Sequence, residues 1–473
     1  MKKSWASEPF LQEKSIINSS SGLAHFSDLH FMIINNYEEL LSHGDVISRE
    51  FLLYLANETL THESYVNRIL ETVKIVDHYM YVKGEEFDLN DYKNIFLISG
   101  GKYSAYMAKA MSDILGSRLK GGIVIDKKDY TFLGSVVKFF KGGHPVPTTE
   151  SFKAGKEVLN LISNIDDDDL LIVCVSGGWT SLVIAVPDNI DTNDVIRTYN
   201  ILLESGMPIN NMNAIRDRIS KLAGGKLVSE TKCNNVIGLI SVDEVGGLPW
   251  GPTVADNISK NELNEILNRY GLTTKLPRNI LNLLEDFTFD PRYDEMRLHN
   301  YAIENNNEMC EFVQNLAISK GIDSYILTTR LEGEAKEVGI FLAQISKEIS
   351  INNRPFKHPC LIIVGGETTV TISEKHGKGG RNQELVLSAL TSFSGIDNIA
   401  MLSIGTDGTD GPTEIAGAII DRFTPSRVRD LNLNLWQELR SHNSSKVFEK
   451  LADVILTNDT VTNLMDLILI YIV

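Results

Sequence analysis

Three glycine-rich segments follow one another near the C-terminus of the sequence, and each combines glycines with polar or charged residues. They are Gly-Gly-Glu-Thr-Thr at 365–369, Gly-Gly-Arg-Asn-Gln-Glu at 379–384 and Gly-Thr-Asp-Gly-Thr-Asp-Gly-Pro-Thr at 405–413. Glycine lets backbone N–H groups approach an anionic ligand without a Cβ in the way. The second segment also places a cation, Arg381, inside its glycine cluster. The three segments therefore predict a site for a phosphate or a carboxylate.

Two loops in the N-terminal half show a related pattern, in which an apolar run ends in a serine and two glycines. They read Ser-Gly-Gly-Lys at 99–102 and Ser-Gly-Gly-Trp-Thr-Ser at 176–181. A strand, a glycine turn and the start of a helix together favour anion binding. Neither loop has the spacing of a Walker A motif. Neither contains GxGxxG, so the sequence does not indicate a dinucleotide-binding fold. Taken alone, each loop also fits a tight turn with capping hydroxyls.

One carboxylate stands out, because Asp243 follows an apolar run and precedes two glycines. A carboxylate in such a loop can accept a hydroxyl proton or bind Mg²⁺, although a lone aspartate also forms turns. The acidic run 166–169 precedes a strand instead, and we interpret it as a solvated loop at the opposite edge. His144, between Gly143 and Pro145, is interpreted as a structural turn residue.

Apolar runs alternate with helix-like segments along most of the chain. Runs such as 95–98, 170–175, 236–240 and 361–364 are continuously apolar, which is typical of strands buried on both faces of a parallel sheet. The sequence predicts an α/β fold of two domains with largely parallel sheets, and functional loops at the C-terminal ends of the strands. The apolar run 467–473 predicts a buried last strand.

Composition limits the partners of the protein. The chain has 473 residues and a net charge of -17, which argues against nucleic acid or an anionic membrane as the main partner. The four cysteines are scattered without a CxxC pair, which argues against a zinc site or a disulfide framework. No apolar run of signal-peptide length follows the N-terminus, and the C-terminal run is too short to span a bilayer, so the cytoplasm is the expected compartment.

The same strings occur in fixed order in one family: the sequence resembles the glycerate 2-kinases that carry a C-terminal MOFRL domain. The resemblance extends from about residue 45 to the end of the sequence. It rests on the segments 143–147, 331–335, 361–385, 405–419 and 462–463.

The resemblance implies transfer of the γ-phosphoryl group of ATP to the 2-hydroxyl of D-glycerate with Mg²⁺, in the cleft between two α/β domains. It implies a Rossmann-like N-terminal domain over 45–285 and a C-terminal domain over 290–473, with the MOFRL region at about 358–466. Residues 1–44 would be an extension, and those before about residue 32 match nothing in the family. No metal ligand and no oligomeric state are implied.

By motif, the catalytic residues of the family fall on Lys102, Asp243 and Arg381. The substrate- and nucleotide-binding residues that the same motifs imply are Ser99, Gly100, Gly101, Ser176, Gly177, Gly178, Arg216, Gly366, Glu367, Thr368, Asn382, Glu384, Asp407 and Asp410.

The sequence departs from the family pattern at several positions, and the loop at Asp243 is a few residues shorter than usual. Trp179 stands where a glycine is usual, Asp217 replaces a cation, and Trp250 replaces a serine. We expect the Trp179 indole to act as a lid over the site, with crowding of larger substrates or simple packing as alternatives. Two other functions stay open: a hydroxypyruvate reductase-type oxidoreductase, and a catalytically impaired homologue that binds glycerate or nucleotide without turnover.

Overall fold

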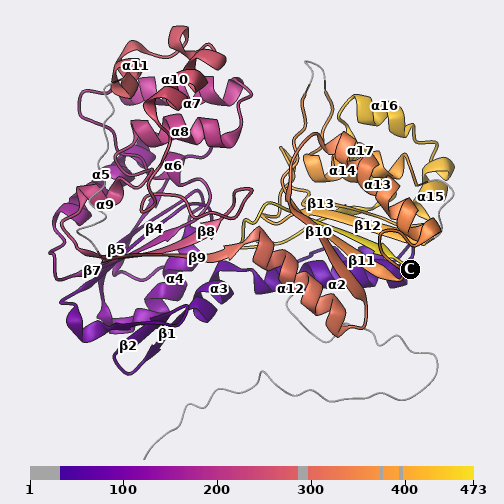
Figure 1. The fold of residues 1–473 in the computed structure, drawn as a ribbon, viewed down its shortest axis with the longest axis horizontal. Coiled ribbons are helices and arrows are strands. Elements are labelled where there is room, and N and C mark those ends of the chain that lie inside the picture. The colour runs from indigo at the N-terminus through magenta and orange to yellow at the C-terminus, as the bar shows by residue number, and fades with distance from the viewer. Residues whose placement is uncertain (1–31, 286–296, 373–375, 394–397) are drawn as a thin grey trace, which may run out of the picture. The chain divides into compact units, whose positions relative to one another are not determined.

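The computed structural model describes residues 32–285, 297–372, 376–393 and 398–473 (Figure 1). The first 31 residues of the expected extension therefore lie outside the described residues. Among the described residues, the strands form two six-stranded sheets and one small sheet of three strands.

The first large sheet is parallel throughout, in the order β6-β5-β4-β7-β8-β9. Its strands are β4 (Ile95–Gly100), β5 (Leu119–Asp126), β6 (Val137–Lys141), β7 (Leu170–Val175), β8 (Asn235–Val242) and β9 (Arg297–Asn305). Counted from β4, this order is 3-2-1-4-5-6, the strand order of Rossmann folds. The missing GxGxxG motif was therefore no guide to the topology, because strand order depends on the crossovers and not on one loop.

Both faces of the parallel sheet are buried, which explains its continuously apolar strands. Along β7, Ile172 and Cys174 pack toward α4 (Ser104–Leu115), while Leu171, Val173 and Val175 pack toward α5 (Thr149–Ser163). Helix α3 (Tyr65–Thr72) joins the first of these two cores.

Further elements extend the parallel sheet. A separate core forms between α7 (Thr192–Glu204), α8 (Ile209–Ile219), α10 (Lys260–Arg269) and α11 (Arg278–Glu285). The small antiparallel sheet contains β1 (Val73–Val76), β2 (Tyr79–Val82) and β3 (Glu85–Asp88). Short helices are α6 (Trp179–Leu182), α9 (Leu227–Glu230) and the 3₁₀ turns η1 (Leu89–Asp91), η2 (Gly116–Arg118) and η3 (Leu272–Thr274).

The second large sheet has the order β10-β11-β15-β12-β13-β14. Its strands are β10 (Asp323–Leu331), β11 (Cys360–Gly366), β12 (Ile399–Gly405), β13 (Gly417–Ile420), β14 (Val454–Ile455) and β15 (Asp466–Ile472). In this sheet β10 and β11 pair in parallel and the other four neighbouring pairs are antiparallel, so the sheet is mixed, whereas the first large sheet has the expected parallel arrangement. The cause of the mixed arrangement is β15, the predicted buried last strand, which lies antiparallel between β11 and β12.

Helices also cover both faces of this mixed sheet. On one face lie α1 (Tyr37–Leu41), α2 (Val46–His62) and α12 (Asn306–Ser319). The other face packs against α13 (Ala335–Asn352), α14 (Arg381–Leu390), α15 (Thr424–Asp430), α16 (Leu435–Arg440) and α17 (Ser444–Leu451). The expected α/β architecture with two large sheets is thus confirmed.

The N-terminal residues of the described chain belong to the mixed sheet. Ile33, Ile34, Tyr37 and Leu40 are buried in the same core as α2 and strands β11, β12 and β15. Inside this core, the fully buried Arg49 of α2 binds Asp421 and, at 2.8 Å, Asp453. The expected boundary at residue 45 stays a prediction, but the described residues on its two sides share one core.

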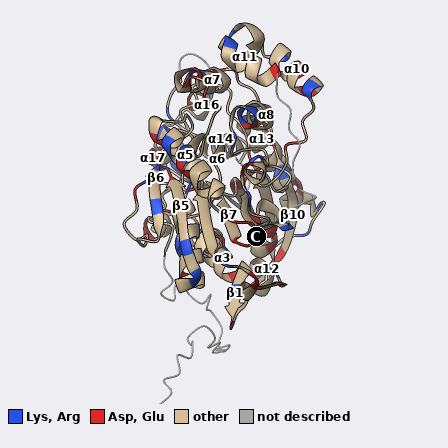
Figure 2. Cartoon of the chain, turned by 90° about the vertical axis from the view of Figure 1, so that its left-hand side faces the viewer, with Lys and Arg blue, Asp and Glu red and all other residues tan. Residues whose placement is uncertain are grey.

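The outer strand of the parallel sheet carries charge. Figure 2 shows Lys and Arg on β5 and β6, and β6 pairs its Lys138 with Glu157 at 3.1 Å and its Lys141 with Asp129 at 2.6 Å. Lysines on an edge strand oppose pairing with strands of other chains. No helix among the described residues is long and apolar enough to cross a membrane.

The packing of residues 33–40 predicts a sharp limit to N-terminal truncation. Deletion of residues 1–31 should leave the melting temperature nearly unchanged, because this stretch of sequence lacks core-like periodicity. Deletion of residues 1–44 should lower it by about 5 °C or more, because each buried apolar side chain that is lost contributes about 1.5–3 kcal/mol. Differential scanning calorimetry of the two truncated proteins checks this, and equal melting temperatures would contradict it.

Candidate active site

The glycine loops after β4 and β7 lie against each other at the point where the strand order of the parallel sheet reverses. Ligands of such sheets bind at this point. The backbone N–H of Lys102 donates to the carbonyl of Gly177 at 2.8 Å, and the hydroxyl of Ser176 donates to the carbonyl of Lys102 at 2.8 Å. These bonds fix the direction in which Lys102 leaves the loop.

The glycines themselves serve close packing between protein segments. A Cβ on Gly101 would collide with Ser176, and a Cβ on Gly177 would collide with the carboxylate of Asp243. In the C-terminal half, a Cβ on Gly366 or Gly380 would collide with neighbouring backbone. These glycines are thus required by close packing of the fold, and their contact with a ligand stays a prediction.

The helix starts behind two of the glycine loops are already occupied by carboxylates. Asp126 accepts from the N–H of Ala105 at the start of α4. Asp410 accepts from the N–H groups of Asn382 at 3.0 Å and Gln383 at 2.9 Å, at the start of α14. Burial raises the pKa of Asp410 to about 6, against the opposing effect of these N–H groups. Anion binding in this region therefore depends on side chains and not on these helix ends.

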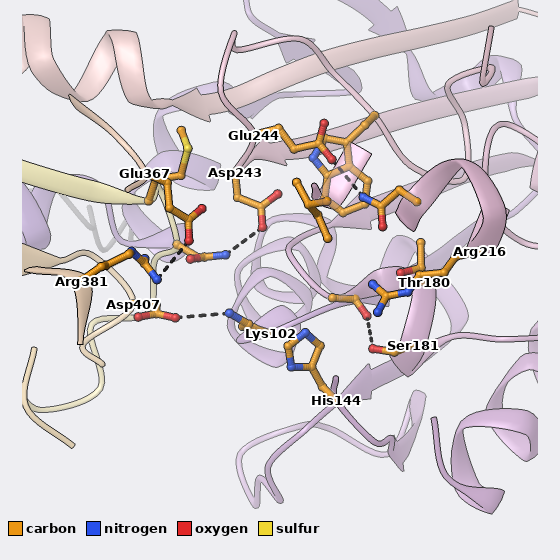
Figure 3. A pocket seen from close by; sticks show the side chains of 16 residues that line it. Lys102, His144, Thr180, Ser181, Arg216, Asp243, Glu244, Glu367, Arg381 and Asp407 are labelled. Atoms are coloured by element: carbon orange, nitrogen blue, oxygen red, sulfur yellow. Dashed lines mark hydrogen bonds and ion pairs between the residues drawn. The ribbon is translucent and has the colours of Figure 1, made fainter. Parts of the chain in front are cut away.

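A polar cavity of about 290 Å³ lies beside these loops (Figure 3). Lys102, Asp243 and Arg381 all line it, so the expectation that these three distant residues share one pocket is confirmed. The other charged or polar residues in its wall are His144, Thr180, Ser181, Asn213, Arg216, Glu244, Glu367, Asp407 and Asn463.

Two of the three cations in the pocket are held by carboxylates. Lys102 Nζ lies 3.2 Å from Asp407. Arg381 binds Asp466 through two hydrogen bonds of 2.7 and 2.8 Å, and its third nitrogen lies 3.1 Å from Glu367. Such a two-bond arrangement fixes the plane of a guanidinium. Arg381 is thus oriented before any ligand arrives.

Arg216 is the third cation, and it is different. Its side chain stacks on the Tyr199 ring at 4.8 Å and the residue is only 6% exposed. Its Nε and Nη2 atoms have no hydrogen-bond partner among the described residues. Figure 3 shows the guanidinium in the pocket wall on the same side as Thr180 and Ser181. Buried nitrogens of a guanidinium without hydrogen-bond partners are costly, so this geometry favours an anionic ligand.

Asp243 faces the same cavity. Asn463 donates a hydrogen bond of 2.8 Å to one of its carboxylate oxygens. The pKa of Asp243 is raised to about 7, because burial, with a smaller contribution from Glu244, outweighs the opposing effect of Lys102. A carboxyl group that titrates near neutral pH can accept a proton from a bound hydroxyl group.

Several of the predicted binding residues support the pocket without lining it. The Ser99 hydroxyl donates to the carbonyl of Ser104, and the Asn382 amide donates to Asp466. Gly100 packs against the Trp179 ring. Among the predicted binding residues, only Gly178, Arg216, Glu367 and Asp407 line the pocket. Thr368 and Glu384 line a second cavity.

The lid interpretation of Trp179 is wrong. The residue is fully buried in the core behind the pocket, and its indole N–H donates to the carbonyl of Leu222 at 2.7 Å. Simple packing, the third alternative, is what the structure has. Asp217 does not line the pocket either; burial and the neighbouring Asp256 raise its pKa to about 7.

Several residues of the site were not among the predicted site residues. His144, interpreted as a turn residue, lines the pocket, and burial lowers its pKa to about 3, so it is neutral at pH 7. Glu244 and Trp250 also line the pocket, and Asp466 holds Arg381. The signal for Asp466 was a lone carboxylate at the start of an apolar run.

The fold and the site define an α/β protein with a polar pocket whose wall contains three cationic side chains. Two family models match the chain: Domain of unknown function (DUF4147) over residues 56–285 and the MOFRL family over residues 360–466. A glycerate 2-kinase from Pyrococcus horikoshii is 33% identical over 89% of this chain and 96% of that protein. A D-glycerate 2-kinase from Thermotoga maritima is 32% identical over 79% of this chain and 90% of that protein.

A solved structure of a glycerate kinase is also similar to this chain. The crystal structure of glycerate kinase from Thermotoga maritima matches with a TM-score of 0.78 and 29% sequence identity, over 90% of this chain and 99% of that one. The chain belongs to the MOFRL-domain glycerate 2-kinase family.

Buried packing of Trp179 predicts a loss of stability on its removal. Trp179→Ala should lower the free energy of unfolding by about 3–5 kcal/mol, because it leaves a cavity in a closed core. Trp436→Ala is the matched control. Because Trp436 is 54% exposed, its replacement should change the free energy of unfolding little. Urea unfolding of both variants checks this. Normal stability of Trp179→Ala together with altered ligand affinity would restore the lid interpretation.

The ion pairs predict different costs for removing the two cations. Arg381→Ala should lower the free energy of unfolding by about 3–5 kcal/mol, because it leaves the buried Asp466 unpaired. Lys102→Ala should cost about 1 kcal/mol or less, because its ion pair is partly exposed. Lys102 is therefore the cleaner residue for activity measurements.

Urea unfolding again gives the measurement for the two cations. In the double variant Arg381→Ala/Asp466→Asn, part of the lost stability should return. Equal stability of the two single variants would reject this account of Arg381.

Proposed function

We propose that this chain transfers the γ-phosphoryl group of ATP to the 2-hydroxyl of D-glycerate. The observation that carries this proposal is one pocket that combines three cations with a carboxyl group titrating near neutral pH. Phosphoryl transfer requires positioning and charge neutralisation more than covalent chemistry by the protein. Family membership supports the same reaction. The cytoplasm stays the expected compartment.

Four charged residues of the pocket have roles in this proposal. Arg216, which lacks a partner for two of its nitrogens, binds the carboxylate of glycerate. Asp243, held by Asn463, accepts the proton of the 2-hydroxyl group. Lys102 and Arg381 offset the negative charge on the transferred phosphoryl group, an effect of about 10²–10³ in kcat for a single contact.

The proposed reaction transfers the phosphoryl group directly from ATP to glycerate. The 2-oxygen of glycerate forms a bond to the γ-phosphorus as the bond from this phosphorus to the β,γ-bridging oxygen breaks. ADP leaves with the electron pair of that bond, and the hydroxyl proton passes to Asp243. The products are 2-phosphoglycerate and ADP.

Magnesium fits this pocket as a companion of the nucleotide. Mg²⁺ usually binds one or two carboxylates together with substrate phosphates and water. The pocket contains four carboxylates against three cations, so a phosphate donor needs added positive charge. Asp407 is the carboxylate that we assign to the ion. Although burial opposes its ionisation, Lys102 and the hydrogen bonds from Thr409 prevail, and the pKa of Asp407 is lowered. When bound, Mg²⁺ would neutralise charge on the phosphates.

The Rossmann strand order favours one rival, a reductase that uses a nicotinamide nucleotide. Against it, the turn after β4 lacks the GxGxxG sequence, and Asp126 occupies the helix start where a pyrophosphate would bind. Incubation with NADH and hydroxypyruvate should leave the absorbance of NADH unchanged.

A coupled assay with ATP, Mg²⁺ and D-glycerate tests the proposal, with product identification by ³¹P NMR. We expect ADP and 2-phosphoglycerate in equal amounts. Formation of 3-phosphoglycerate would reject the 2-hydroxyl as acceptor. Binding of ATP or glycerate without turnover would identify an impaired homologue instead.

The raised pKa of Asp243 predicts opposite effects on activity and stability. Asp243→Asn should lower kcat by about 10²–10⁴-fold, and the kcat/KM of the unchanged protein should rise with pH through about 7. Because the folded pKa lies above the unfolded value, the stabilising contribution of this group is complete at low pH and lost as pH rises through about 7.

Asp243→Asn should therefore raise the melting temperature relative to the unchanged protein, and the rise should be larger at about pH 8 than at about pH 5, because the contribution is lost progressively from the unfolded pKa of about 4 to the folded pKa of about 7. Thermal unfolding at both pH values provides the measurement. The exposed Asp129→Asn is the control and should show neither effect. A flat pH profile of kcat/KM would contradict the role of Asp243 as base.

A further inference from the structure

A second cavity adjoins the first on the side of the mixed sheet. It measures about 360 Å³, and both cavities are lined by Glu367 and Arg381. Its wall also contains Thr368, Val370 and Ile372 from the segment after β11, together with Glu384 and His442. The arginine that faces the first pocket is thus also part of the second.

The size of the first cavity limits what it can hold. At about 290 Å³ it lies at the lower end of the range for ligand pockets, roughly 300–1,000 Å³. Its lining is dominated by charged and polar side chains, which suit a three-carbon acid and one phosphoryl group. A complete nucleotide and the acceptor acid together need more space and a less polar surface for the base.

We propose that the second cavity binds the nucleoside part of the phosphoryl donor, while the acceptor acid occupies the first, so that the transferred phosphoryl group lies at Arg381. This inference rests on the proposed function. It assigns the two substrates to two cavities that share one cation, an arrangement in which donor and acceptor meet without competing for the same space.

The side chains of the second cavity suit a nucleoside. Ile372 is 53% exposed at its rim and Val370 is half-buried beside it, so both offer apolar surface to a base. The Thr368 hydroxyl is buried, with the residue only 3% exposed, and it has no hydrogen-bond partner among the described residues. A ligand group could satisfy this hydroxyl.

A carboxylate in the same wall suits the sugar. Glu384 accepts a hydrogen bond of 3.0 Å from His442, and both residues line the cavity. This bond fixes the direction of the carboxylate, whose remaining lone pairs can accept from ribose hydroxyls, as acidic residues do in other nucleotide sites. Apolar surface, a free hydroxyl and an oriented carboxylate thus lie within one cavity next to Arg381.

Equilibrium binding tests the assignment separately from turnover. Isothermal titration calorimetry would measure the Kd values of ADP, inorganic tripolyphosphate and D-glycerate for each protein. Thr368→Val should raise the Kd of ADP by about two- to tenfold, which is the effect of one hydrogen bond. The double variant Thr368→Val/Ile372→Gln should raise this Kd by about tenfold or more. Tripolyphosphate and D-glycerate should bind as before, because neither contains a nucleoside.

Two controls separate this role from a structural one. Ile318→Gln is matched to Ile372→Gln, because Ile318 is 54% exposed and lines neither cavity, and it should leave all three Kd values unchanged. Thr368→Val removes a buried hydroxyl without a partner, so its melting temperature should not fall.

The outcomes distinguish this inference from the proposed function. Unchanged ADP binding in the double variant would overturn the nucleoside site while leaving the kinase reaction intact. Equal weakening of ADP and tripolyphosphate would also overturn it, because the cavity would then bind phosphates. Selective loss of ADP affinity in a protein that fails to phosphorylate glycerate would support the nucleoside site and reject the reaction. No binding of ADP to the unchanged protein would overturn the inference.

Discussion

The direction of β15 decides which residues meet at the pocket. Because β15 runs antiparallel between β11 and β12, its first residue, Asp466, lies opposite Gly366 and Gly405, the last residues of those two strands. The start of one strand thus joins the C-terminal ends of its neighbours, where functional loops gather. Asp466 reaches Arg381 from there, and Asn463, just before the strand, reaches Asp243. If β15 ran parallel to its neighbours, both residues would lie at the other end of the sheet, where those strands begin.

The sequence predicted which residues line the pocket better than it predicted the structural role of the glycines beside them. Lys102, Asp243 and Arg381 were found because unusual strings occur in fixed order, and all three line one cavity. Glycine beside charge was interpreted as ligand contact, and the structure adds a second cause, because Gly101 and Gly177 are required where protein segments touch. A glycine string alone cannot distinguish these causes, since both need a position without a Cβ.

Other features depended on long-range packing that local patterns do not contain. Helix α2 packs on the mixed sheet, whose strands lie far along the chain, and no local pattern in the sequence says which sheet a helix covers. Trp179 follows a glycine loop, so it was expected at the surface, yet its ring fills the space beside Gly100. The sequence also did not predict the antiparallel direction of β15, because a strand buried on both faces has the same continuous apolar pattern in either direction.

The charges of the site are arranged so that most are satisfied before any ligand binds. Lys102 and Arg381 already have carboxylate partners, which holds them in place and reduces the reorganisation that binding requires. Arg216 and Asp243 are the exceptions: two nitrogens of Arg216 lack hydrogen-bond partners among the described residues, and burial disfavours the charged form of Asp243. Both exceptions cost stability in the folded protein. A ligand that brings an anion to Arg216 and a hydroxyl group to Asp243 relieves both, so the two least satisfied groups of the pocket specify the chemistry of its acceptor.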